Sequence, residues 1–195
     1  MKKSKIILIV CVVALVAFLA LSAKVIDKGT EGQYTGEVAF DASASSSGDW
    51  DVVLKEITAN AQDVASVDLS ALGDGKAVSL KGMVSEYVSK AAGKKNSITV
   101  APEGYSGDAV FSVQLGSIYS GTAVRDAQTV KSFGDFTNQT EWSQYAKALN
   151  SQLDELVVAP LAIDEGIQGK TVEIIGAATA SGGEVTITPV AITIE

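Results

Sequence analysis

The spacing of apolar residues divides this chain into an apolar start, a helical region and a longer part with strand-like alternation. Residues 6–20 are apolar without interruption and follow three lysines among the first five residues. Residues 42–48 are small and serine-rich and predict a loop, after a short strand or docking segment marked by Val38 and Phe40. From about Asp49, apolar residues recur at helical spacing, which predicts a helix. Its apolar positions are Trp50, Val53, Leu54, Ile57, Ala61 and Val64.

Three strands follow this helix. Between residues 76 and 88, apolar and polar positions alternate in the manner of a β-strand. Residues 97–101 and 109–115 predict the second and third strands, with turns at 91–95 and 102–107.

A long amphipathic helix is the strongest local signal in the chain. Asn138 is placed to cap it, Glu141 follows three residues later as in a capping box, and Pro160 is expected to end it. The apolar stripe consists of Trp142, Tyr145, Ala146, Leu149, Leu153, Leu156 and Val157. We expect Trp142, Leu149 and Leu153 to be buried against the sheet.

Two strands close the chain, at residues 171–176 and 185–194, joined by a turn at Gly182-Gly183. Three strands, a helix and two strands is the element order of an OB-type barrel. We therefore predict a mainly β fold with helices (α+β): a five-stranded OB-like barrel with a long helix between strands 3 and 4, plus a small N-terminal helical segment. A twisted open sheet packed on the helix is the alternative. The bends of such a barrel would be relieved by Gly82, Gly116, Gly121 and Gly176.

This pattern predicts four regions along the chain. Residues 1–23 form a signal peptide or membrane anchor, and residues 24–36 form a polar tether. Residues 37–75 form an N-terminal segment with one helix, and residues 76–195 form the OB-like barrel domain.

The apolar start predicts export in three alternative forms, which the sequence leaves open. The small residues Ala20 and Ser22 permit cleavage before Ala23. Residues 6–23 are 18 residues long, close to the roughly 20 that a membrane-spanning helix needs, so the segment also suits an uncleaved anchor. Lipidation on Cys11 is the third form, although little apolar sequence precedes that residue. In each form the rest of the chain works outside the cytoplasmic membrane, on its periplasmic or extracellular face.

Composition narrows the classes of function and of partner that the chain can have. Without the three lysines of its first five residues, the chain keeps 12 of its 15 basic residues and all 23 acidic ones, a net charge of −11. Such a domain repels nucleic acid, so nucleic acid is not an expected partner. The chain has no histidine, and Cys11 is its one cysteine. We therefore expect no disulfide, no metal site, no cofactor and no catalytic residues, and a protein that is not an enzyme.

The polar segment of residues 121–139 is the candidate binding region, because it joins a strand to the long helix. Its donors and acceptors are of the kinds that recognise sugar hydroxyls or peptide backbones. The candidate ligand- or partner-binding residues are Thr122, Arg125, Asp126, Asn138 and Gln139. The alternative is structural, with Arg125 and Asp126 paired to neighbouring loops and Asn138 only capping its helix.

Three motifs in this region resemble a known family. They are SIYSGTAVRDA at residues 117–127, FGDFTNQTE at 133–141 and ALN at 148–150. The chain resembles the uncharacterised family of predicted periplasmic lipoproteins, domain of unknown function 2291. The resemblance implies an exported protein without assigned activity, often encoded beside sugar ABC transporters. This chain differs from the family at residues 21–24, where Leu-Ser-Ala-Lys stands in place of a lipobox such as Leu-Ser-Gly-Cys-Lys.

Together these features predict a membrane-associated accessory protein of the cell envelope, held at the cell membrane by its N-terminal segment. The resemblance implies ABC transporter components as partners. The alternative is a small-ligand or carbohydrate-binding module, with a small sugar as its partner.

Overall fold

A computed structural model describes residues 39–89, 96–116 and 118–195. The chain divides into two compact units, Met1–Phe40 and Asp41–Glu195, and the second is described here. The expected signal or anchor at residues 1–23, the tether at 24–36 and the turn at 91–95 lie outside the described residues. In the described part of the chain, none of the helices has the length and apolar character needed to cross a membrane.

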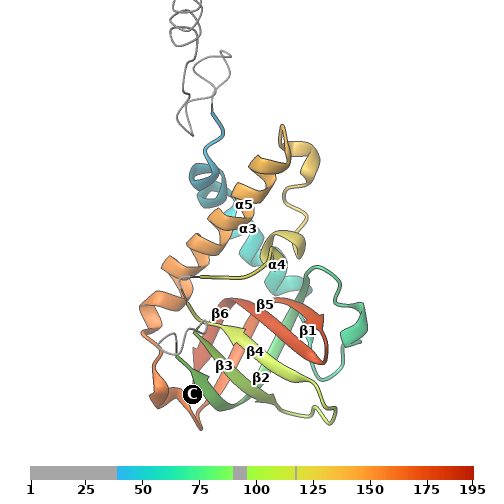
Figure 1. The fold of residues 1–195 in the computed structure, drawn as a ribbon, viewed down its shortest axis with the longest axis vertical. Coiled ribbons are helices and arrows are strands. Elements are labelled where there is room, and N and C mark those ends of the chain that lie inside the picture. The colour runs from blue at the N-terminus through green and yellow to red at the C-terminus, as the bar shows by residue number, and fades with distance from the viewer. Residues whose placement is uncertain (1–38, 90–95, 117) are drawn as a thin grey trace, which may run out of the picture. The chain divides into compact units, whose positions relative to one another are not determined.

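Five strands close into a barrel (Figure 1). They are β2 (Lys76–Val88), β3 (Ser97–Pro102), β4 (Val110–Gln114), β5 (Thr171–Ser181) and β6 (Glu184–Ile194). Their order is β2-β3-β4-β6-β5, and β5 pairs again with β2. β4 and β6 are parallel and the other barrel pairs are antiparallel. The prediction of an OB-like barrel is confirmed, and the open sheet is excluded because β5 returns to β2.

Strand β2 pairs with two neighbours along its length, because it bends in the middle. Residues 76–83 pair with β5, while residues 82–88 pair with β3. Gly82 belongs to both ladders. A Cβ there would collide with the carbonyl oxygen of Ala101 and lie 2.9 Å from the Cα of Pro102. The predicted role of Gly82 at a barrel bend is thus explained by close approach of the backbones.

The barrel interior is filled by every second residue of each strand, as alternation requires. β5 and β6 are joined by Gly182-Gly183, both with positive φ, as the predicted two-residue turn needs. The core side chains, each at most 2% exposed, are Val78, Leu80, Val84, Ile98, Val100, Phe111, Val113, Val172, Ile174, Val185 and Ile187.

The long helix α5 (Gln139–Leu153) lies between β4 and β5, which are the third and fourth barrel strands, as predicted. Leu149 and Leu153 are fully buried, as expected, but Trp142 is only half-buried. Their main neighbour is not the sheet. Helix α3 (Ala42–Asn60) contacts α5, which it crosses in Figure 1, and also contacts β2 and β5. The expectation that α5 packs directly on the sheet is wrong, because α3 supplies its apolar partner.

The end of the long helix also differs from prediction. After Leu153 the chain forms a π-helical turn (Asp154–Val158) and then a 3₁₀ turn (Ala159–Leu161) that contains Pro160. A π turn holds more residues than an α turn and shifts the phase of the stripe. Leu156 is therefore 51% exposed, whereas Val158 is buried in its place.

Helix α3 begins seven residues earlier than predicted. The carboxylate of Asp41 accepts a hydrogen bond from the amide of Ala44 at 2.9 Å and caps the helix at Ala42, so the serine-rich segment is helical and not a loop. The helix ends at Asn60, and the buried Val64 belongs to the chain beyond the short strand β1 (Gln62–Asp63). No strand includes Phe40, and Val38 lies outside the described residues.

Candidate functional site

Three of the predicted site residues form one hydrogen-bonded cluster at the short helix α4 (Ala123–Asp126). The hydroxyl of Thr122 donates to Oδ2 of Asp126. Arg125 donates to Oδ1 of the same carboxylate from Nε at 2.8 Å, and its Nη2 lies 2.7 Å from that oxygen. The guanidinium carbon lies 4.3 Å from the ring centroid of Trp142. Much of the hydrogen-bonding capacity of this cluster is therefore used within the protein.

The other two predicted residues lie at the start of α5. Oδ1 of Asn138 accepts from the amides of Thr140 at 2.9 Å and Glu141 at 3.0 Å, which is N-capping. Glu141 completes the arrangement by accepting from the amide of Thr137 at 2.9 Å. Gln139 is exposed at the first position of the helix. Arg125 reaches the same helix turn through Trp142, so the two halves of the predicted region meet there.

An aromatic cluster fixes this junction. Phe136 lies 5.0 Å from Trp142 and 5.2 Å from Tyr145, measured between ring centroids. The hydroxyl of Tyr145 donates to Oδ2 of Asp49 on α3 at 3.1 Å. Burial raises the pKa of Tyr145, and the charge and hydrogen bond of Asp49 raise it further. The phenol stays protonated and joins α5 to α3.

A groove of about 430 Å³ with hydroxyl and amide side chains in its lining crosses the outer surface of β3, β4 and β6. We call this surface the barrel face. The strand register aligns Thr99 with Ser112 and Ser112 with Thr186, so three hydroxyl side chains lie in one row across the strands. In the described residues, none of these three hydroxyls is engaged in a hydrogen bond. They remain available to a ligand or partner.

Side-chain hydrogen bonds of Gln114 hold the edge of the barrel face in place. The side-chain amide of Gln114 donates to Oγ1 of Thr188 at 2.8 Å, and both residues are buried. The amide oxygen of Gln114 accepts from the backbone amide of Ser120 at 2.7 Å. Glu184 is the one charged side chain among the described residues of the groove. This lining provides neutral donors and acceptors and suits binding.

The sequence analysis missed the barrel face. Its signal is present, because hydroxyl and amide side chains stand two apart in Ser97-x-Thr99, Ser112-x-Gln114 and Thr186-x-Thr188. Alternation alone shows only that the two residues of each pair share one side of their strand. All of them except Thr188 meet in one groove because β4 pairs in parallel with β6, which joins segments about seventy residues apart.

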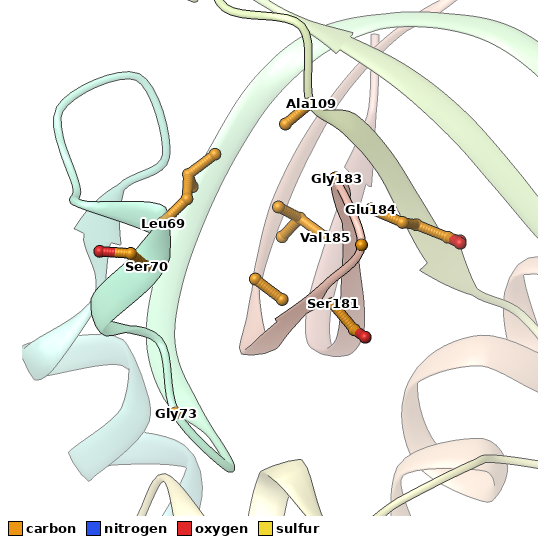
Figure 2. Close-up of a pocket in the computed structure, with 10 residues that line it drawn as sticks. Leu69, Ser70, Gly73, Ala109, Ser181, Gly183, Glu184 and Val185 are labelled. Carbon is orange, nitrogen blue, oxygen red and sulfur yellow. The ribbon is translucent and has the colours of Figure 1, made fainter.

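A smaller pocket of about 340 Å³ lies at the end of the barrel beside the β5–β6 turn. Figure 2 shows the side chains of Leu69, Ala109 and Val185 around it. Ser70 also lines it, but its hydroxyl already donates to Asp68 at 2.7 Å. In the described part of the chain, no three His, Cys, Asp or Glu side chains are grouped to hold a metal ion.

The sequence matches the family described as "Predicted periplasmic lipoprotein (DUF2291)" over residues 76–193. The chain belongs to this family. The match covers the barrel strands except the last residue of β6, together with α4 and α5. It agrees with the expected place of the protein, exported to the periplasmic face of the membrane.

Solved structures support the fold. An OB-fold protein from Thermotoga maritima superposes with a TM-score of 0.57 at 16% identity, covering 80% of this chain and 99% of that one. At this identity the likeness shows the fold alone. No curated protein matches this member of the family.

Proposed function

We propose that the protein is a non-enzymatic accessory protein of the cell envelope that docks a partner on its barrel face. The observation that carries the proposal is the row of unengaged hydroxyls of Thr99, Ser112 and Thr186. Thr99 and Ser112 lie on the second and third strands of the barrel, the face where OB folds bind chain-like ligands, and Thr186 on the fifth strand continues the row.

The dimensions of the barrel face favour an extended segment as the occupant. Neighbouring strands lie about 4.8 Å apart, so a row over three strands spans roughly 10 Å. The groove extends from Val88 and Asn96 at one end to Val110 and Glu184 at the other. Such a surface can follow several residues of a polypeptide. The acidic balance of the chain disfavours the nucleic acids that many OB folds bind.

The partner we propose is a component of a sugar ABC transport system. This link comes from the family resemblance and from the membrane association that a lipoprotein family implies. The absence of histidine from the sequence supports the non-enzymatic part of the proposal.

Cross-linking in native membranes followed by affinity purification of the full-length chain tests this function. We expect a transporter component to be enriched with the wild type. The substitutions Thr99→Arg and Thr186→Arg place a long cation in the groove and should reduce the enrichment at least tenfold. Thr58→Arg is the matched control, since Thr58 is exposed on α3. Equal enrichment by all three variants, or none by the wild type, would refute partner docking on the barrel face.

A small-ligand or carbohydrate-binding module is the second candidate function. The unengaged hydroxyls favour it because they also match the alternating donors and acceptors of a saccharide. A ligand raises the free energy of unfolding by RT ln(1 + [L]/Kd) and thereby raises the melting temperature, whereas an accessory protein without a ligand shows no shift. Arg125→Ala and Asn138→Ala should remove that shift if the predicted region of residues 121–139 is the site.

A further inference from the structure

A second groove lies between α5 and the chain that follows β4. It has a volume of about 530 Å³, larger than the groove on the barrel face and within the range of roughly 300–1,000 Å³ of small-molecule sites. We call it the α5 groove. Its lining residues are Ile118, Tyr119, Lys147, Asn150, Ser151, Asp154 and Glu155. None of them belongs to the barrel face.

Local geometry distinguishes this groove from an ordinary polar helix face. The α-helix ends at Leu153, and Asp154 and Glu155 are the first two residues of the π-helical turn. π turns are rare and often occur at functional sites. Here the widened turn forms one end of the α5 groove.

The hydrogen bonds of the groove leave specific acceptors open. The hydroxyl of Tyr119 donates to Oδ1 of Asp154 at 2.9 Å and fixes that carboxylate. Burial, followed by this hydrogen bond and the charge of Asp154, raises the pKa of Tyr119, so the phenol keeps its proton. Asn150 donates through Nδ2 to the carbonyl of Gly121 at 3.4 Å. In the described residues, Oδ2 of Asp154 and the carboxylate of Glu155 accept no hydrogen bond.

The charges and apolar surface of the groove define the ligand class. The groove contains two carboxylates and one amine, that of Lys147. This excess of negative charge disfavours an anion as the ligand. The amine in turn disfavours a bare metal cation, and the three charged side chains disfavour a lipid chain. Ile118 is 56% exposed and gives the groove an apolar wall. A molecule that combines many hydroxyls with C–H faces meets all of these conditions.

We infer that the α5 groove binds a neutral polyhydroxylated molecule of mono- or disaccharide size. Asp154 and Glu155 accept hydrogen bonds from its hydroxyls, and Lys147 donates to a further oxygen. Ile118 covers its C–H face. The site is separate from the barrel face, so the inference goes beyond partner docking and does not depend on it.

Calorimetric titration of the full-length chain with D-glucose, maltose and myo-inositol tests the inference. The chain should be held in an amine-oxide detergent, because a glycoside detergent would itself carry a sugar. We expect saturable binding of at least one of the three. Asp154→Asn keeps the size and the acceptor for Tyr119, and Lys147→Met keeps the apolar stem. Each should weaken binding at least tenfold.

Matched controls locate the effect. Asp51→Asn and Lys55→Met make the same changes at exposed positions of α3 and should bind like the wild type. Thr99→Arg on the barrel face should also leave this binding unchanged, which separates it from partner docking. The inference is overturned if none of the three probes binds the wild type, or if the Asp154 and Lys147 variants bind normally. Displacement of the bound probe by millimolar inorganic phosphate would assign an anion site and also overturn it.

Discussion

Gly82 shows how one residue sets the curvature of the barrel. It lies where β2 changes its partner from β5 to β3, against the backbone of Ala101 and Pro102. A glycine can be suspected from sequence, but the reason for it is a contact between strands. The consequence of this contact can be measured by adding a single methyl group.

Gly82→Ala should destabilise the fold by about 1–3 kcal/mol, because backbone atoms cannot move away as a flexible side chain can. Gly48→Ala is the control. Gly48 lies inside α3 with open space around it, so alanine there should stabilise by about 0.5–1 kcal/mol. Urea unfolding followed by tryptophan fluorescence measures both. Equal effects at the two positions would contradict the proposed close approach.

The phenols of the half-buried Tyr119 and the buried Tyr145 predict a loss of stability at alkaline pH. Their pKa values are raised in the folded protein above the value of about 10 for an unfolded tyrosine. Above pH 10 the unfolded chain therefore releases protons that the folded chain retains, and the free energy of unfolding falls as pH rises. Below pH 10 both states keep the proton and this contribution is fully present.

The urea midpoint should consequently drop between pH 8 and pH 11. In the double variant Tyr119→Phe/Tyr145→Phe that drop should be smaller, whatever the stability of the variant at pH 8. A drop of the same size in both proteins would show that other groups cause the alkaline loss.

At the scale of elements, local signals identified most helices and strands but not their ends. The cap at Asn138 and the strand alternation were readable because they depend on neighbours in sequence. The early start of α3 depends on Asp41, which caps a serine-rich turn that alone favours a loop. The π turn after Leu153 has no local signature in the apolar stripe, and tertiary packing decides it.

Two leucines of α5 test this shift in phase. Leu149 is fully buried, so Leu149→Ala should cost about 2–5 kcal/mol. Leu156 belongs to the same predicted stripe but is half-exposed beyond the start of the π turn. Leu156→Ala should change stability by less than about 0.5 kcal/mol. Chemical denaturation of both variants measures the two costs. A large loss of stability in Leu156→Ala would contradict the π turn and favour a straight α-helix.

At the scale of the whole molecule, the family places the protein on the periplasmic side of the membrane. Alkaline phosphatase fused after Glu195 should therefore be active, since that enzyme needs an oxidising compartment to form its disulfides. Green fluorescent protein of a kind that folds only in the cytoplasm should stay dark when it is fused to the same chain and exported with it. The reverse pair of results would contradict export.

The sequence by itself determined the order of the main strands and helices, many of the core residues and the acidic, histidine-free composition, while the pairing of β5 with β2 decided that the sheet closes into a barrel. These follow from periodicity and composition, which are properties of short segments and of the whole chain. Only the tertiary structure decided which polar residues stand together. The barrel face needs the parallel pairing of β4 with β6, and the α5 groove needs Tyr119 to meet Asp154 across 35 positions. Such contacts between distant segments arise from packing and register, and no local spacing encodes them.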